Sequence, residues 1–226
     1  LVVNVPDYHG EVWDGPERLR RFRVVVGNAR QSRGRMINAT PTLSSRIATV
    51  VYNPWWNVPR RIFEKELRPK AESFEAKRAS EPSADDGNDA PVDYWEAKGY
   101  ELEGGEDPNK QWVRRRPGPG NALGKVKLLF DNRYFVYLHD TPSKRKFREA
   151  RRAFSHGCMR VQEPLALAEL LLRRDGTWQE VVDARVMTHY RETRITMRHP
   201  VPIVVTYLTA RVDNGGRVHW LHDVYR

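Results

Sequence analysis

Short stretches of β-branched and aromatic residues, separated by glycine and proline, dominate the hydrophobic pattern of the chain. Such stretches are typical of strands, and Gly and Pro mark the turns between them. Asp14-Gly15 is suited to a hairpin turn. The pattern predicts strands over residues 1–5, 11–13, 22–26, 46–52, 126–130, 134–139, 202–210 and 217–221. The fold class expected is therefore mainly β with helices.

Helical patterns occupy three further places. Residues 60–78 begin as an amphipathic helix that Pro69 is expected to interrupt. Pro164 opens a leucine-rich helix that Asp175-Gly176 closes, and its leucines are expected to belong to the core. Residues 178–188 are the third candidate.

The composition changes between residues 60 and 112. Residues 79–91 contain Ser, Pro, Asp, Gly and Asn but no large apolar residue, which indicates a surface loop. A chain of 226 residues is expected to be one domain over 1–226, into which 60–112 is inserted.

The charge of the chain is strongly positive. Its 39 Lys and Arg residues against 29 Asp and Glu residues give a net charge of +10. Such a surplus indicates one of two things. Either the basic residues form a solvated surface without a partner, or they attract an anionic polymer such as nucleic acid, acidic lipid or a cell wall with free carboxylates. No nucleic-acid-binding motif accompanies the basic clusters at 114–116 and 144–152. No apolar run of about 18 residues predicts a membrane-spanning helix.

The only cysteine, Cys158, lies in the stretch Ser155-His156-Gly157-Cys158-Met159-Arg160. A lone cysteine is usually a small buried hydrophobic residue, and it cannot form an internal disulfide. A nucleophilic cysteine needs a base and donors for the oxyanion that forms on attack. His156 lies two residues before Cys158, and His139 ends an apolar run nineteen residues upstream of it.

Positive charge near a thiol lowers its pKa from roughly 8.5. The basic segment 144–152 is therefore either a solvated face or a positive wall that acts on Cys158. The remaining histidines show no spacing typical of a metal site, so no metal is expected.

The spacing of these residues carries a family resemblance. His139, fifteen intervening residues and then Ser155-His156-Gly157-Cys158 resemble the signature of the YkuD-type L,D-transpeptidases. Longer stretches resemble its YcbB-like branch, among them Asn53-Pro54-Trp55-Trp56-Asn57, Arg116-Pro117-Gly118-Pro119-Gly120 and His139-Asp140-Thr141-Pro142. The resemblance covers residues 2–60 and 112–208 and is loose between them.

The resemblance implies a YkuD-type β-sandwich in which the insertion 60–112 forms a lid over the active site. A tolerated surface insertion is the alternative. Cys158 would be the nucleophile and His139 its base, with the backbone carbonyl of Asp140 as third member of the triad. Further expected site residues are, for the oxyanion and its support, Gly157, His156, Ser155 and Asp140, and, for substrate binding, Arg160, Trp56, Asn57 and Arg116.

The implied reaction is a two-step acyl transfer that needs no metal or organic cofactor. Cys158 would attack the bond between residue three and D-Ala four of a peptidoglycan tetrapeptide stem. The amine of another stem would then attack the thioester, which gives a 3→3 cross-link. Carbapenem β-lactams would acylate the same thiol, and the periplasm would be the location.

Alternatives remain at this point. Water as acceptor would make the protein an L,D-carboxypeptidase, and a lipoprotein amine is a third acceptor. From another class, the chain could be a non-catalytic peptidoglycan-binding module. Because the chain begins on a strand-like segment, upstream domains are expected to be missing.

Overall fold

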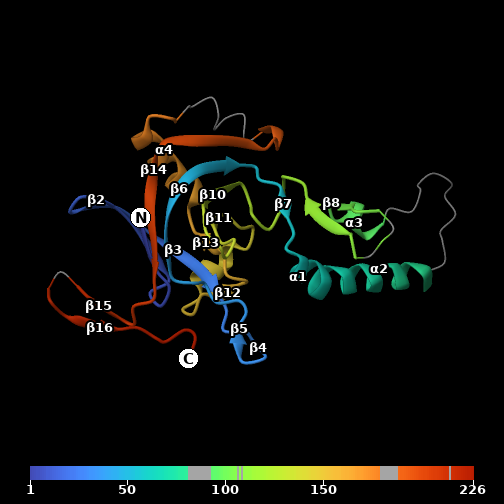
Figure 1. Ribbon diagram of the computed structural model, residues 1–226, viewed down its shortest axis with the longest axis horizontal. Helices are drawn as coiled ribbons and strands as arrows, with labels where there is room; N and C mark the ends of the chain where they lie inside the picture. The colour runs from blue at the N-terminus through green and yellow to red at the C-terminus, as the bar shows by residue number, and fades with distance from the viewer. Residues whose placement is uncertain (81–92, 106, 108, 179–187, 214) are drawn as a thin grey trace. The chain divides into compact units, whose positions relative to one another are not determined.

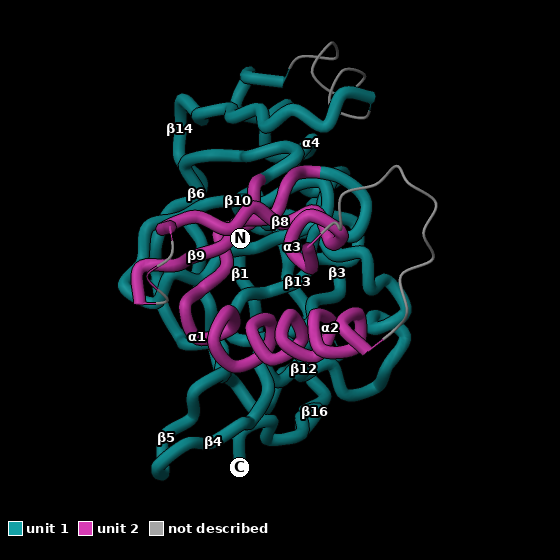
Figure 2. The backbone as a smooth tube through the Cα atoms, turned by 90° about the vertical axis from the view of Figure 1, so that its right-hand side faces the viewer, with its two compact units in different colours: residues 1–54, 118–226 teal, residues 55–117 magenta. Residues whose placement is uncertain are grey.

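The computed structural model describes residues 1–80, 93–105, 107, 109–178, 188–213 and 215–226. The chain divides into two compact units, residues 1–54 with 118–226 and residues 55–117 (Figure 2). The predicted insertion 60–112 falls within the second unit, and its role as a lid remains a prediction.

A mixed sheet forms the first unit (Figure 1). Its strands are β1 Val2–Asn4, β2 His9–Asp14, β3 Glu17–Gly27, β6 Leu43–Tyr52, β10 Val126–Phe130, β11 Leu138–His139, β12 Ala153–Ser155, β13 Met159–Val161 and β14 Thr193–Thr206. Among the described residues they follow the order β12-β3-β13-β11-β10-β6-β14-β1-β2. Because β2 also pairs with β3, the sheet returns on itself around one apolar core. The mainly β fold class is confirmed.

Alternating burial explains why these segments form strands. In β10, Val126, Leu128 and Phe130 are buried, whereas the two residues between them are partly exposed. This period of two turns one side of each strand to the core. Asp14-Gly15 turns between β2 and β3 as predicted, and Gly15 has a φ of 55°.

The last long strand differs from its predicted range of 202–210. β14 begins at Thr193 and ends at Thr206, and it pairs with β6 through an irregularity between Thr196 and Val201. The side chain of Asn4 binds the backbone N–H and carbonyl of Leu208, which draws the chain away from the sheet. A separate hairpin follows, formed by β15 Ala210–Val212 and β16 Val218–Trp220.

The predicted strand 134–139 is wrong except for its last two residues. The side chain of Asn132 accepts hydrogen bonds from the N–H groups of Tyr134 and Val136 and donates to the carbonyls of Phe130 and Val136. This local ring of bonds replaces strand pairing. Phe135 consequently adopts a left-handed φ of 55° and is exposed.

Helix α4, Pro164–Asp175, has the predicted ends. Pro164 starts it, and Gly176 closes it with a left-handed φ of 71°. Leu167, Leu171 and Leu172 are buried in the core. The 3₁₀ turn η2, Lys144–Arg148, lies in the basic segment and buries Phe147, while β4 Gln31–Ser32 and β5 Arg35–Met36 form a small hairpin.

The second unit has its own small core. It contains β7 Trp56–Asn57, α1 Arg60–Ile62, the π-helical turn η1 Phe63–Leu67, α2 Arg68–Ser80, α3 Tyr94–Ala97, β8 Tyr100–Glu103 and β9 Trp112–Arg115. The strands form a sheet in the order β7-β9-β8. Its buried core consists of Val58, Phe63, Leu67, Tyr100 and Val113.

Pro69 does not interrupt the helix, so that prediction is wrong. The helical segments run without a break from Arg60 to Ser80. Pro69 is the second residue of α2 and follows the wider π-helical turn, where the missing N–H and the ring are tolerated.

Two predictions concern residues that are described only in small part. The loop predicted over 79–91 and the helix predicted over 178–188 lie almost wholly outside the described residues. None of the described helices is long and apolar enough to cross a membrane.

Asp175 joins the end of α4 to β14. Its carboxylate accepts hydrogen bonds from the N–H groups of Arg198 at 2.8 Å and His199 at 2.7 Å. We predict that Asp175→Ala lowers the free energy of unfolding by about 1–2 kcal/mol, because these donors lose their acceptor. Urea unfolding followed by near-UV circular dichroism measures the change.

Glu169→Ala on the same helix is the matched control, because it removes only an exposed ion pair with Arg173. It should change the free energy of unfolding by less than about 0.5 kcal/mol. Equal effects of both substitutions would contradict a structural role of Asp175.

Candidate active site

Pairing between β11 and β13 places the predicted base and nucleophile on neighbouring segments. The strands are parallel, with Leu138 opposite Met159 and His139 opposite Arg160. The Met159 N–H donates to the Tyr137 carbonyl at 3.0 Å, which continues the register one residue towards Cys158. Because side chains alternate, Tyr137 and His139 lie on one face, beside Cys158 and Arg160 of the neighbouring segment.

The imidazole of His139 is fixed by its own backbone neighbour. His139 is buried, and its Nδ1 forms a hydrogen bond with the carbonyl oxygen of Asp140. A carbonyl can only accept, so Nδ1 carries the hydrogen. In the neutral ring this leaves Nε2 as the nitrogen that can take up a proton.

The Asp140 carbonyl is in turn held by the Asp140 side chain. Its buried carboxylate accepts from the N–H groups of Lys125 at 2.8 Å and Thr141 at 2.7 Å, and it pairs with the ammonium group of Lys144. A Cβ added to Gly124, whose φ is 60°, would lie 2.3 Å from Asp140 Oδ2. Glycine at this position therefore makes room for the carboxylate that orients the carbonyl.

Cys158 is a partly buried residue, and its sulfur lies among three neighbours. Tyr137 forms hydrogen bonds with it through its backbone and its hydroxyl, the Phe135 carbonyl lies 4.0 Å from Sγ, and Arg160 acts on it by charge. Burial raises the pKa of the thiol to about 11, although Tyr137 and Arg160 both favour the thiolate.

The same surroundings keep His139 uncharged. Burial, followed by the charge of Arg160, lowers the pKa of its imidazole to about 3, against the opposing effect of the Asp140 carbonyl. Both groups are therefore neutral at pH 7. Two neutral groups suit general-base catalysis rather than a resting ion pair, and transfer of the thiol proton to Nε2 stays a prediction.

A turn before the cysteine holds it in place. Ser155 Oγ donates to the Cys158 carbonyl at 2.5 Å and accepts from the Gly157 N–H at 3.1 Å. Thr40 Oγ1 donates to the Gly157 carbonyl at 2.8 Å. Gly157 has a φ of 120°, which other residues rarely adopt. Ser155 thus supports the turn, while His156 is exposed on it.

Gly157 and Cys158 remain the predicted oxyanion donors. The Gly157 N–H is engaged by Ser155, so it would have to leave that bond to act. No described residue accepts a hydrogen bond from the Cys158 N–H. The Cys158 N–H is therefore the donor that needs no rearrangement.

Arg160 is the cation that acts on the thiol. Its Nε is buried and has no hydrogen-bond partner among the described residues. The basic segment 144–152 has other contacts: Lys144 pairs with Asp140, and buried Arg152 donates to the carbonyls of Tyr8, Val24 and Glu149. A positive wall from this segment is not among the causes of the thiol's pKa shift.

The remaining predicted site residues lie in the second unit. Trp56 is half-buried, with its ring centroid 6.4 Å from that of Tyr100. Asn57 is exposed. Arg116 is exposed, and its Nε donates to Glu101 Oε1 at 3.0 Å. Their part in substrate binding stays a prediction.

Two residues of the site, Tyr137 and Thr40, were not singled out from the sequence, and Lys144 was expected only as part of the basic segment 144–152. Tyr137 lies two residues before His139, so strand alternation could have placed both on one face. No sequence pattern pointed to Thr40, because it lies in a segment without regular secondary structure. Phe135 and Tyr137 also line a mostly apolar pocket of about 390 Å³, whose lining does not include Cys158.

The described residues contain no cluster of three or more His, Cys, Asp or Glu side chains that could hold a metal ion.

Comparisons with known proteins point to one family. The model of the YkuD family, described as the L,D-transpeptidase catalytic domain, matches residues 1–203. A protein of Haemophilus influenzae named "Putative L,D-transpeptidase" is 31% identical over 233 residues, covering 100% of this chain. The aligned part is 44% of that relative, so the chain spans less than half of its length.

The protonation state of the thiol is directly testable, because Cys158 is the only cysteine. We predict that its alkylation by iodoacetamide is slow at pH 7 and increases at alkaline pH, with a midpoint near 11 rather than the roughly 8.5 of a free thiol. Arg160→Gln should move the midpoint higher, because Arg160 favours the thiolate.

Arg145→Gln, in the exposed part of the basic segment, is the control and should leave the midpoint unchanged. A midpoint below 7 in the unmodified protein would contradict the neutral pair and indicate a resting thiolate.

Proposed function

The chain belongs to the YkuD family of L,D-transpeptidase catalytic domains, and from this premise we propose that it forms 3→3 cross-links in peptidoglycan. Cys158 is the nucleophile and His139 the general base of this proposal. We further propose that it belongs to the YcbB-like branch, because several of its stretches resemble that branch. The hydrogen bond from His139 Nδ1 to the Asp140 carbonyl carries the proposal, because it leaves Nε2 ready to accept a proton.

The first step acylates the cysteine. Cys158 Sγ attacks the carbonyl carbon between residue three and D-Ala four, while its proton passes to His139 Nε2. The oxyanion accepts from the Cys158 N–H, and the Arg160 guanidinium stabilises the added negative charge. His139 then returns the proton to the leaving nitrogen, the C–N bond breaks, and D-Ala departs from the thioester.

The second step transfers the acyl group. The side-chain amine of another stem attacks the thioester carbon, and His139 Nε2 takes up the proton that the amine loses. The C–S bond breaks, and the sulfur regains a proton from His139. Because His139 is neutral at pH 7, its Nε2 can accept a proton in each of the two steps.

Substrate recognition is assigned to cations and to an apolar wall. A carboxylate of the stem would complete the bonding of Arg160, whose Nε is buried without a partner among the described residues. The pocket lined by Phe135 and Tyr137 would hold apolar parts of the stem. Trp56, Asn57 and Arg116 belong to the second unit, and their role in substrate binding, like a role of that unit as a lid, is part of this proposal.

The cellular role follows from this chemistry. The protein would act in the periplasm, in the assembly of the cell wall that determines cell shape. Its net charge of +10 favours a wall that bears free carboxylates. Carbapenems would inhibit it, because their strained carbonyl would acylate Cys158.

We predict that incubation with purified disaccharide-tetrapeptide yields a cross-linked dimer with loss of D-Ala, detected by mass spectrometry. Cys158→Ala should abolish the product, because no thioester can form. His139→Gln should lower the rate by about 10²–10⁴-fold, the usual contribution of a general base.

Cys158→Ser is a matched control that retains the shape of the site but offers a poorer nucleophile. A tripeptide as sole product would contradict cross-linking and indicate the L,D-carboxypeptidase. Absence of turnover, together with the absence of a carbapenem adduct on Cys158 by intact mass, would indicate a binding module.

A further inference from the structure

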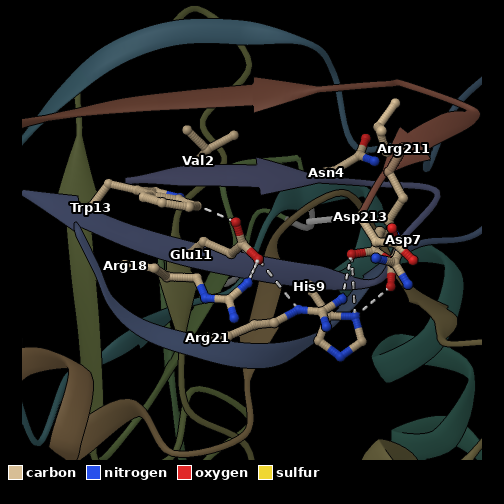
Figure 3. Close-up of a pocket in the computed structure, with 11 residues that line it drawn as sticks. Val2, Asn4, Asp7, His9, Glu11, Trp13, Arg18, Arg21, Arg211 and Asp213 are labelled. Carbon is tan, nitrogen blue, oxygen red and sulfur yellow. Dashed lines mark hydrogen bonds and ion pairs between the residues drawn. The ribbon is translucent and has the colours of Figure 1, made fainter. Parts of the chain in front are cut away.

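A second pocket lies on the outer face of β1, β2 and β3, and its volume is about 380 Å³ (Figure 3). None of the catalytic residues discussed above lines it. Val3, Val12 and Phe22 of these strands are buried in the core, so their alternate neighbours face outwards. The hairpin of β15 and β16 supplies the other wall through Arg211 and Asp213. This volume is typical of small-ligand sites.

An exposed indole forms one end of the pocket. Trp13 is 43% exposed, yet its ring is held in place, because Nε1 donates to Glu11 Oε2 at 3.1 Å. The guanidinium carbon of Arg18 lies 5.8 Å from the ring centroid. A fixed, exposed aromatic ring offers an apolar surface without a large cost in side-chain entropy.

The polar groups of the pocket are balanced in charge. Glu11 pairs with Arg18 at 3.1 Å and with Arg21 at 3.4 Å. Asp7 pairs with Arg21 at 2.8 Å and with Arg211 at 3.7 Å, as the dashed lines of Figure 3 partly trace. Burial raises the pKa of Asp7, but hydrogen bonds and charges from His9 and Arg21 lower it by more, so the net pKa is below its ordinary value. The carboxylate is therefore ionised at neutral pH.

The paired acidic and basic side chains indicate which class of ligand the pocket can bind. The lining contains three Arg, two Asp and one Glu side chains besides His9, so an anion would compete with pairs that already exist. A neutral molecule with many hydroxyl groups would meet donors and acceptors side by side, and its apolar face could cover the indole. A pyranose ring has both properties.

We propose that this pocket binds the glycan strand of the polymer whose peptide stems the catalytic centre uses. The inference rests on the proposed function for the identity of the sugar. Trp13 supports the face of an N-acetylated pyranose, and the pairs of Glu11 and Asp7 with arginines bind its hydroxyls. The site would hold the strand while its stems react elsewhere.

Isothermal titration of the 226-residue chain with N,N′,N″,N‴-tetraacetylchitotetraose, a neutral β-1,4-linked oligomer, tests the site. We expect saturable binding that Trp13→Ala weakens by about tenfold or more, because the stacking surface is lost. Trp13→Phe should retain part of the affinity, which separates loss of the ring from misfolding. Cys158→Ala should bind as the unmodified protein does.

Trp112→Ala is the matched control, because Trp112 is also 43% exposed but lies in the second unit. It should leave binding unchanged. Absence of binding to the unmodified protein, or equal binding by Trp13→Ala, would overturn the inference.

Turnover of substrates with and without sugar distinguishes a failure of the proposed sugar site from a failure of the proposed transpeptidase function. With a tetrapeptide that lacks sugar, Trp13→Ala should react as fast as the unmodified protein. With disaccharide-tetrapeptide its KM should rise while kcat stays the same. Chitotetraose binding that depends on Trp13 would support a sugar site even if no tetrapeptide is turned over.

Discussion

The hydrogen bond between His139 Nδ1 and the Asp140 carbonyl is the constraint on which the proposed chemistry depends. It determines which nitrogen of a buried imidazole is free. Among the residues that the structure describes, no carboxylate forms an ion pair with this ring. Instead the carboxylate of Asp140 binds two backbone N–H groups and Lys144, and so fixes the carbonyl that accepts from the ring.

The surrounding sheet makes this constraint useful. Parallel pairing of β11 with β13 sets His139 opposite Arg160 and brings Cys158 beside Tyr137. Burial then disfavours charge on both the thiol and the imidazole. Arg160 opposes only the first of these effects, since a cation favours the thiolate but disfavours an imidazolium. The thiol and the imidazole are therefore both neutral at rest, and charge on them develops only as the substrate reacts.

The sequence predicted β1, β2, β3, β6, β10 and helix α4 because their patterns are local, but it did not predict β12 or β13. Alternation in Val126–Phe130 and the Pro164 and Gly176 signals need no tertiary knowledge. The irregular path around Phe135 could not be predicted, because the side chain of Asn132 replaces strand pairing there. The same holds for Pro69, which the preceding π-helical turn accommodates.

The candidate site was predictable to a similar extent. The spacing of His139 and Cys158 named the two groups, but not the charge state that burial gives them. The Asp140 carboxylate is held by the Lys125 N–H and the Lys144 ammonium group, in the space that Gly124 leaves open. No pattern in the sequence indicated these contacts. Contacts between distant residues carry no local signal.

Long-range ¹H–¹⁵N correlation NMR of the imidazole nitrogens tests the central claim most directly. His139, assigned by its loss in His139→Gln, should show a protonated Nδ1 and an unprotonated Nε2 at pH 7. This pattern should persist down to about pH 5, since the pKa of His139 lies at about 3. A His139 ring with both nitrogens protonated at pH 7, or with the hydrogen on Nε2, would contradict the account.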